Sequence, residues 1–581
     1  MADTINSDDD EDLKLAIALS LQDAESSATS TEKNAQSTSA EISSFLSSKP
    51  ITSSTRIEPV KPPITFGGIN LDRKKMEDER LARQAQRKRA ADSDGEPVVP
   101  SKKARVLPWL DNATAVSIQP ANIPQPTQLP HQIKPDQSTS NATSTSIPTI
   151  KHPKGAVFRT KSARHPRGRD ISIEEVLQRD FLETALISSF SFNLEWLFGK
   201  LNTRKTKLML CMAAKTEAQR KQYAEEALEV GKGSIKCCFP PMEGETNSMH
   251  SKLMILKYEQ SLRIVVTSAN MELYDWGETG DMENTVFLID LPRLAGDAQT
   301  EADLTPFGKE LIYFATKCNM PESVTKALLK FNFAATSDIA LVHSVGGFSF
   351  GSDMRRTGLN SLAISIHQLG LVPPKNTSIE LHYATASLGA LNDNYLTALH
   401  NAASGVLADS STRAKTKADK GIREFVCVYF PTRQTVAASI GGTDSAGTIC
   451  LQRKWYQQDT FPRSVMRDHV PTRTGILSHS KIILGHCKNS GPAWAYIGSA
   501  NLSESAWGKV VKDSKKKEMK MVCRNWECGV LLRVRKAKDT TSATTKEDGL
   551  RILFDPTLDI PFEIPGRGYG QQQPWFFPHQ M

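Results

Sequence analysis

Apolar residues in the larger, C-terminal part of the chain follow two spacings that alternate along the sequence. Residues 171–201 carry apolar side chains three and four positions apart, which predicts helix. Residues 217–228 and 321–329 are also predicted helices. The short runs 207–211 and 425–430 are almost wholly apolar, as in buried strands. Strands that alternate with helices predict an α/β fold in which helices cover mixed sheets.

One pattern of apolar and polar residues occurs twice and predicts two β-hairpins. In the first copy, His250-Ser251-Lys252 precedes the apolar run 253–256. The segment Glu259-Gln260-Ser261 has the composition of a turn. A second apolar run at 264–266 then leads into Ser268-Ala269-Asn270. The first copy is therefore a strand, a turn and a returning strand that ends at an asparagine.

The second copy repeats this order. His479-Ser480-Lys481 precedes the run 482–484, residues 488–492 form the turn, and the returning strand ends at Ser499-Ala500-Asn501. Residues two apart on a strand point to the same side, so the histidine and lysine of each copy face together, beside the asparagine. Each half gathers an imidazole, an ammonium and a carboxamide, which predicts one active site built from two half-sites.

A carboxylate follows each copy and opens a further apolar strand: Glu283 in the first copy and Glu527 in the second. A carboxylate there is suited to accept a hydrogen bond from a histidine Nδ1–H and to raise the basicity of Nε2. A third His-x-Lys, at residues 152–154, lacks the strand and the asparagine and is discarded. Two structural histidines in duplicated hairpins are the alternative interpretation.

Composition limits the class of protein. A chain of 581 residues is more than one core usually organises, so we expect two core units and non-globular sequence. The formal charge of +8 weakly favours a polyanionic partner. Acidic residues at 8–12 replace the apolar segment of a signal peptide, and no apolar run is long enough to span a bilayer. The nine cysteines match no zinc spacing. We expect a soluble intracellular protein without membrane contact or structural metal.

Composition also divides the chain. Residues 26–60 and 111–150 are dominated by Ser, Thr, Pro, Gln and Asn, which predicts disordered linkers. We therefore expect a disordered regulatory region at 1–154. Two similar halves follow at 155–350 and 351–581, each a mixed sheet between helices, related by a pseudo-twofold axis.

An amphipathic helix is predicted at residues 8–25, where an acidic cluster precedes apolar residues spaced four apart. This segment resembles the ubiquitin-interacting motif, whose small alanine admits a close apolar partner surface. The resemblance implies ubiquitin binding through Leu13, Ala16, Ile17 and Ser20. A helix that packs on the rest of the chain is the alternative.

Basic residues cluster at 73–105. Arg87-Lys88-Arg89 and Lys102-Lys103-Ala104-Arg105 flank a short acidic-polar spacer, an arrangement that resembles a bipartite nuclear import signal. The resemblance implies a nuclear protein. A solvated charge run, or a loose tether to nucleic acid, is the alternative.

The paired half-sites resemble the phospholipase D superfamily, whose halves each contribute a His-x-Lys motif. The aspartate that usually follows the lysine by five residues is replaced by Lys257 and His486. His-x-Lys with the asparagine but without this aspartate marks the tyrosyl-DNA phosphodiesterase family. The resemblance extends from about Ile171 to the terminal Pro574-Trp575, and the first half resembles fungal sequences.

This resemblance implies a mechanism without metal or cofactor. His250 would be the nucleophile that forms a covalent phosphohistidine with DNA, and His479 the general acid and base. The non-bridging oxygens would be held by Lys252, Lys481, Asn270 and Asn501. Glu527 would orient His479 or its counterpart, and Glu283 occupies a position where the family often carries Gln.

The resemblance also implies contacts with the substrate. The DNA backbone would be bound at Thr385, Ala386, Ser387 and Ser503, although such stretches are ordinary turns in most proteins. Phe190 and Trp575 are candidates to stack on a base or peptide, with core packing favoured for Phe190.

The expected substrate is a DNA 3′ end, single-stranded or duplex, that bears a topoisomerase I tyrosyl peptide. One chain supplies both half-sites, so a monomer suffices. A broader phospholipase D-like nuclease and a ubiquitin-binding adaptor with an inactive domain are the alternatives.

Overall fold

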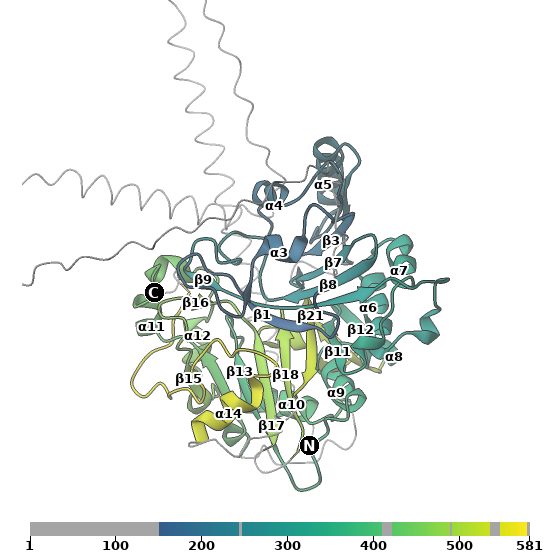
Figure 1. The fold of residues 1–581 in the computed structure, drawn as a ribbon. Helices are drawn as coiled ribbons and strands as arrows, with labels where there is room; N and C mark the ends of the chain where they lie inside the picture. The colour runs from purple at the N-terminus through teal and green to yellow at the C-terminus, as the bar shows by residue number, and fades with distance from the viewer. Residues whose placement is uncertain (1–149, 243–246, 410–420, 488–490, 535–545, 578–581) are drawn as a thin grey trace, which may run out of the picture. The chain divides into compact units, whose positions relative to one another are not determined.

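The computed structural model describes residues 150–242, 247–409, 421–487, 491–534 and 546–577 (Figure 1). The chain divides into two units, residues 1–65 and 66–581, and every described residue lies in the second. The predicted helix at 8–25, the basic region at 73–105 and nearly all of the region 1–154 lie outside the described residues. No described helix is long and apolar enough to cross a membrane.

The first half of the described chain forms an eight-stranded mixed sheet. In spatial order its strands are β2 (Asp170–Ile171), β1 (Ala156–Thr160), β10 (Thr285–Pro292), β8 (Ser261–Thr267), β7 (Leu253–Lys257), β3 (Thr184–Ser188), β4 (Lys207–Cys211) and β5 (Ile235–Cys238). The predicted first hairpin is the antiparallel pair β7–β8.

The second half repeats this order. Its main sheet runs β11 (Ile339–Ser344), β21 (Asn525–Arg533), β18 (Ala493–Gly498), β17 (Ile482–Cys487), β13 (Ile379–Ala384), β14 (Val426–Phe430) and β15 (Met466–Asp468). Strand directions match as well: β3–β4–β5 and β13–β14–β15 are parallel, and the hairpins are antiparallel. The prediction of two similar halves, each with a mixed sheet, is confirmed.

The boundary between the halves falls earlier than predicted. The strand β11 is the counterpart of β1, since each lies beside the last strand of its half. Our boundary at residue 350 assigned β11 to the first half, whereas its hydrogen bonds to β21 place it in the second sheet. The second half therefore begins before Ile339.

Helices and strands form four layers (Figure 1). On the first sheet lie α3 (Ile173–Leu177), α4 (Leu194–Lys200) and α5 (Glu217–Gly231), and on the second lie α9 (Leu359–Gln368) and α10 (Asp393–Ala403). Between the two sheets, apolar side chains of β7 and β8 share one core with those of β17 and β18. Both faces of each hairpin are therefore buried, which explains their continuous apolar runs.

The remaining elements are shorter or lie at the edges of these layers. They are β6 (Ser248–Met249), β9 (Met282–Glu283), α6 (Pro306–Lys317), α7 (Glu322–Leu328), β12 (Gly347–Phe350), α8 (Gly351–Met354), α11 (Arg433–Ala437), α12 (Arg453–Tyr456), β16 (Leu477–Ser478), α13 (Glu504–Trp507), β19 (Lys509–Lys512), β20 (Met519–Cys523) and α14 (Lys546–Phe554).

One predicted element is wrong. Residues 171–201 were expected to be helical, but β3 lies between α3 and α4. Ala185, Leu186 and Ile187 are fully buried within the first sheet. Periodicity alone does not distinguish so short an apolar run from a buried helix segment. The other predicted helices and strands are confirmed as α5, α7, β4 and β14.

Two short strands connect the halves. β6, just before His250, pairs in parallel with the start of β21, and β16, just before His479, pairs in parallel with β9. The backbone N–H of His250 donates to Trp526 (3.0 Å), and that of His479 donates to Glu283 (3.0 Å). Each histidine is thus held by the trailing strand of the opposite half.

Candidate active site

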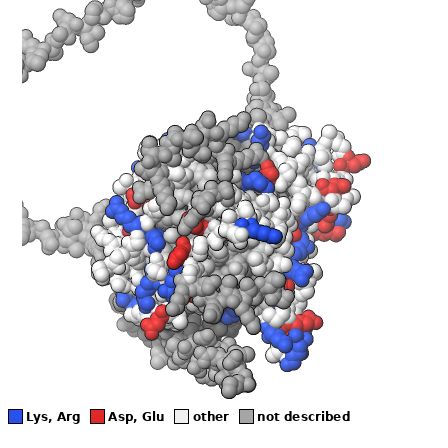
Figure 2. Space-filling view, turned by 90° about the horizontal axis from the view of Figure 1, so that it is seen from below, with Lys and Arg blue, Asp and Glu red and all other residues white. Residues whose placement is uncertain are grey.

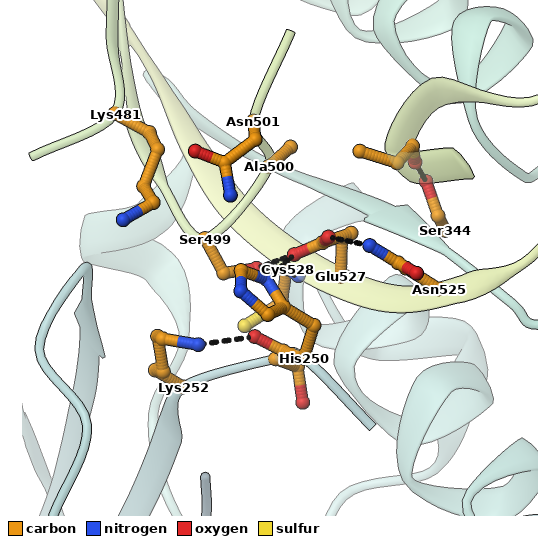
Figure 3. A network of polar contacts seen from close by, with 12 residues as sticks. His250, Lys252, Ser344, Lys481, Ser499, Ala500, Asn501, Asn525, Glu527 and Cys528 are labelled. Atoms are coloured by element: carbon orange, nitrogen blue, oxygen red, sulfur yellow. Dashed lines mark hydrogen bonds and ion pairs between the residues drawn. The ribbon is translucent and has the colours of Figure 1, made fainter. Parts of the chain in front are cut away.

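His250 is oriented by a carboxylate of the second half. Its Nδ1 lies 2.9 Å from Glu527 Oε2 (Figure 3). Glu527 is buried and also accepts hydrogen bonds from the Ser499 hydroxyl and from Asn525 Nδ2 (2.9 Å). Burial would raise the pKa of Glu527, but His250, Lys252 and the Ser499 hydroxyl outweigh burial and hold this pKa below its ordinary value. An ionised Glu527 fixes the proton of His250 on Nδ1 and leaves the Nε2 lone pair available for attack.

His479 is paired with a carboxylate that we did not predict from the sequence. Asp275 Oδ1 lies 3.1 Å from His479 Nδ1, within ion-pair distance. Asp275 is fully buried and accepts from the backbone N–H and Nδ2 of Asn270 (2.8 and 2.7 Å) and from Asn284 Nδ2 (3.0 Å). A signal for it does exist: Trp-Gly follows the asparagine at the same spacing in both copies, preceded by Asp275 in the first and Ala506 in the second.

The predicted equivalence of Glu283 and Glu527 is wrong by one residue. Ser268 N donates to Thr285 and Ser499 N donates to Cys528, so the strand register places Asn284 at the position of Glu527. A shift of one residue on a strand turns a side chain to the opposite face. Glu283 therefore points away from His479.

Glu283 instead belongs to a buried ion-pair cluster. It accepts from Arg159 at 2.8 Å and lies 3.3 Å from Arg473 Nη1. Arg473 also pairs with Asp170 (2.8 Å). Glu283 thus joins the first sheet to the segment before His479, and the structure does not bring its carboxylate to the imidazole of His479.

Each half-site contains a buried lysine, and both lysines lie close enough to influence both histidines. Lys252 Nζ donates to the backbone carbonyl of His250 (2.7 Å), and Lys481 Nζ donates to that of His479. Both lysines lower the pKa of both histidines, so the two half-sites enclose one positively charged space (Figure 3). An oxyanion between two ammonium groups in a site of low dielectric is strongly stabilised.

Burial and the lysines keep both histidines neutral. Burial is the main cause that lowers the pKa of His250 to about 4 and that of His479 to about 3. A neutral imidazole is the form that can act as a nucleophile. To act as an acid His479 would have to be protonated, and a bound anionic phosphate would raise its pKa by offsetting Lys252 and Lys481.

The two asparagines present different atoms. Asn501 Oδ1 accepts from Thr385 Oγ1 and from the backbone N–H of Ser387, both at 3.1 Å, and its amide nitrogen points toward His250 and Ser499 in Figure 3. Asn270 uses Nδ2 on Asp275, and its buried Oδ1 makes no hydrogen bond in the described structure. Asn501 therefore offers a donor suited to a phosphate oxygen, whereas Asn270 offers an acceptor suited to an ammonium group.

The four residues predicted to bind DNA have different roles in the structure. Thr385 and the Ser387 backbone position Asn501. Ser503 caps α13 by accepting from Ala506 N (3.3 Å). Ala386 is fully buried, so its side chain is not available to DNA.

The structure reverses our expectation for the two aromatic residues. Trp575 is fully buried in the core of the second half. Phe190 is 43% exposed, and its ring centroid lies 5.5 Å from that of His250. Phe190 is thus the aromatic side chain available to a substrate at this site.

Among the described residues, one group of side chains, Glu380, His382 and His486, could hold a metal ion. It lies toward the far end of β17 from Lys481, about 17 Å along the strand. The histidines and lysines of the candidate active site therefore do not belong to it.

Comparison with known proteins agrees with the geometry. The family model described as "Tyrosyl-DNA phosphodiesterase" matches residues 156–570, and the model "Ubiquitin interaction motif" matches residues 8–24. Tyrosyl-DNA phosphodiesterase 1 of Arabidopsis thaliana is 23% identical over 70% of this chain and 71% of its own length. The Saccharomyces cerevisiae protein of the same name is 24% identical over 72% and 84%.

Solved structures show the same fold. The yeast tyrosyl-DNA phosphodiesterase aligns with a TM-score of 0.53 at 19% identity, covering 73% of this chain and all of that one. A mutant of the yeast protein, in which asparagine replaces a histidine, aligns with a TM-score of 0.54 at 21% identity, over the same shares.

Proposed function

Since the chain belongs to the tyrosyl-DNA phosphodiesterase family and is a phosphodiester hydrolase, we propose that it releases topoisomerase I peptides from DNA 3′ ends through a phosphohistidine on His250. The observation that carries this proposal is a pair of histidines, each beside its own buried carboxylate. His250 is held by Glu527 and His479 lies beside Asp275, with two lysines between them.

The first step exchanges one bond at phosphorus for another. Nε2 of His250 attacks the phosphorus as the bond to the tyrosyl oxygen breaks, and the bonding pair leaves on that oxygen. His479 donates its proton to the oxygen. A phenol, with a pKa of about 10, is a fair leaving group, so this step needs only moderate acid catalysis.

The second step frees the enzyme. His479, now neutral, takes a proton from water as the water oxygen attacks phosphorus, and the bond between phosphorus and His250 breaks. The product is a DNA 3′-phosphate. Lys252 and Lys481 stabilise the charge on the non-bridging oxygens in both transition states, which is the work that a metal ion does in other phosphodiesterases.

A cleavage assay in excess EDTA tests this function. The full chain should convert a 5′-labelled 3′-phosphotyrosyl oligonucleotide to the 3′-phosphate product, since none of the steps above uses a metal. A 3′-hydroxyl oligonucleotide of the same sequence controls for contaminating exonuclease. If the folded protein leaves the tyrosyl substrate intact, the tyrosyl-DNA assignment is lost.

We propose that the N-terminal region brings the enzyme to ubiquitin-modified adducts. The match to the ubiquitin interaction motif at 8–24 supports binding of ubiquitin-modified adducts through Leu13, Ala16, Ile17 and Ser20. Titration of labelled full-length chain with ubiquitin should shift resonances around Ala16 and Ser20, and the Ala16→Arg variant should show no shift. Unchanged spectra of the wild type at millimolar ubiquitin would reject this role.

The basic region at 73–105 is proposed to bring the protein to the nucleus, where its DNA substrate lies. A tagged full-length chain imaged in cells tests this, and exclusion from the nucleus would contradict it.

A further inference from the structure

A small sheet projects from the second half beside the main one. It consists of β12, β20 and β19 in that order, all antiparallel. Its inner face packs on the domain: Met521 is fully buried in the core, and Ser349 beside it is 7% exposed. The sheet is therefore fixed to the domain through one face only.

The outer face combines aromatic and basic side chains. Neighbours across strands point to the same side, as do residues two apart. One row on this face is Phe348, Val522 and Lys509, and the next is Phe350, Lys520 and Val511. Phe348 is 53% exposed, so its ring is accessible from solvent.

Lysines surround the two rings. Residues 509–520 contain six lysines against Asp513 and Glu518, a local charge of +4. Lys516 Nζ lies 4.0 Å from the centre of the Phe350 ring, and Lys520 Nζ lies 4.1 Å from that of Phe348. Two of the six are in ion pairs, Lys520 with Asp513 and Lys509 with Glu504. The other four are exposed. Lys512 pairs with Met519 and lies on the side of Met521, so Lys515, Lys516 and Lys517 are the exposed lysines considered for the outer face.

This concentration of charge is local. On the face drawn in Figure 2, basic side chains lie in small groups mixed with acidic ones. Aromatic faces interleaved with lysines are typical of a nucleic-acid surface, because single-stranded nucleic acid stacks its bases on aromatic rings and pairs its phosphates with cations.

The small sheet is joined to the candidate active site along the chain. Asn501 and Ser503 precede β19, and Glu527 follows β20 by four residues. Ser344, at the end of β11 and just before β12, pairs with Glu527 in the main sheet. Lys509 follows Asn501 by eight positions, which limits the distance between them to about 27 Å. A DNA strand of several nucleotides spans this distance.

We propose that the outer face of β12, β20 and β19 binds single-stranded DNA upstream of the 3′ end held at His250. Bases stack on Phe348 and Phe350, and phosphates pair with Lys515, Lys516 and Lys517. The ligand is taken as DNA from the proposed function, and the site is separate from the residues that perform the chemistry.

Binding of 3′-hydroxyl thymidine oligonucleotides of 4, 8, 16 and 24 nucleotides to the full chain tests this proposal by fluorescence anisotropy. Phe348→Ala should weaken binding of the 24-mer roughly ten-fold, as expected for one lost stacking contact, and leave the 4-mer unchanged. Replacing Lys515, Lys516 and Lys517 by glutamine should lower the dependence of log affinity on log salt by about 0.7 for each lost phosphate contact.

Matched controls separate a local effect from loss of net charge. Leu228→Ala removes another exposed apolar side chain, and glutamine at Lys221, Lys232 and Lys236 removes the same charge elsewhere. Equal losses in test and control variants, or losses independent of oligonucleotide length, would overturn the proposal. Cleavage of a four-nucleotide tyrosyl substrate by the wild type shows separately whether the proposed function holds.

Discussion

Replacing His250 by alanine should reduce cleavage of a 3′-phosphotyrosyl oligonucleotide by about 10⁴-fold or more. In the proposed mechanism the variant lacks the atom that attacks phosphorus, and residual catalysis depends on the two lysines and His479. The measurement is the single-turnover rate in EDTA, with oligonucleotide affinity as a check on the site. The space left by the imidazole lies beside a buried Glu527, so thermal unfolding should be compared with that of the wild type.

The chain offers a matched control in its third His-x-Lys. His152→Ala removes a histidine outside the site, where the ring packs on Phe158 at 5.3 Å. It should retain the wild-type rate. A His250→Ala rate within ten-fold of the wild type, in a folded protein that binds DNA, would remove His250 as the nucleophile.

Replacing His479 by asparagine should trap the reaction halfway. Tyrosine leaves with modest help, so the first step should slow by about ten- to a hundred-fold. Hydrolysis needs a base to activate water and should slow by about 10³-fold or more. A quenched time course of 5′-labelled substrate on a denaturing gel should show DNA migrating with the protein before free 3′-phosphate appears.

The double variant His250→Ala/His479→Asn is the control for this experiment, since it should form no adduct. Slow product formation by His479→Asn in a single phase, without a DNA-linked protein band, would mean that the two histidines are assigned the wrong way round.

The half-sites were predictable because their signal is local. His250 and Lys252 are two residues apart and adjoin one strand, and the apolar runs 253–256 and 264–266 fix the hairpin that carries them. The second copy at His479 has the same spacing, so a repeated topology followed from a repeated pattern. No knowledge of tertiary contacts was needed for this part.

The orienting carboxylates depend on tertiary register. Glu283 and Glu527 look equivalent when the two sequence copies are aligned. The strand pairing in the structure differs from that alignment by one residue, so Asn284 occupies the position equivalent to Glu527. Asp275 lies in a loop, and loops lack the regular spacing of apolar residues from which the position of a side chain can be predicted. The comparison of Asp275-Trp276 with Ala506-Trp507 was the available signal.

The burial of single aromatic residues could not be predicted from the sequence either. Phe190 lies among the regularly spaced apolar residues of 171–201, and core packing was favoured for it, whereas Trp575 was a candidate to stack on a substrate. In the folded chain Trp575 N donates to Pro431 and its ring joins the core, while Phe190 lies against His250. These positions follow from how distant segments pack, which periodicity does not encode.

The central claim is that His250 carries the DNA-linked phosphate. The most direct measurement is mass spectrometry of protease-digested His479→Asn protein, quenched at mildly alkaline pH during turnover of a short 3′-phosphotyrosyl oligonucleotide. The account predicts a nucleotide phosphate on the peptide that contains His250, bonded to its imidazole nitrogen. An adduct on any other residue, or gel-visible turnover without an adduct, would contradict it.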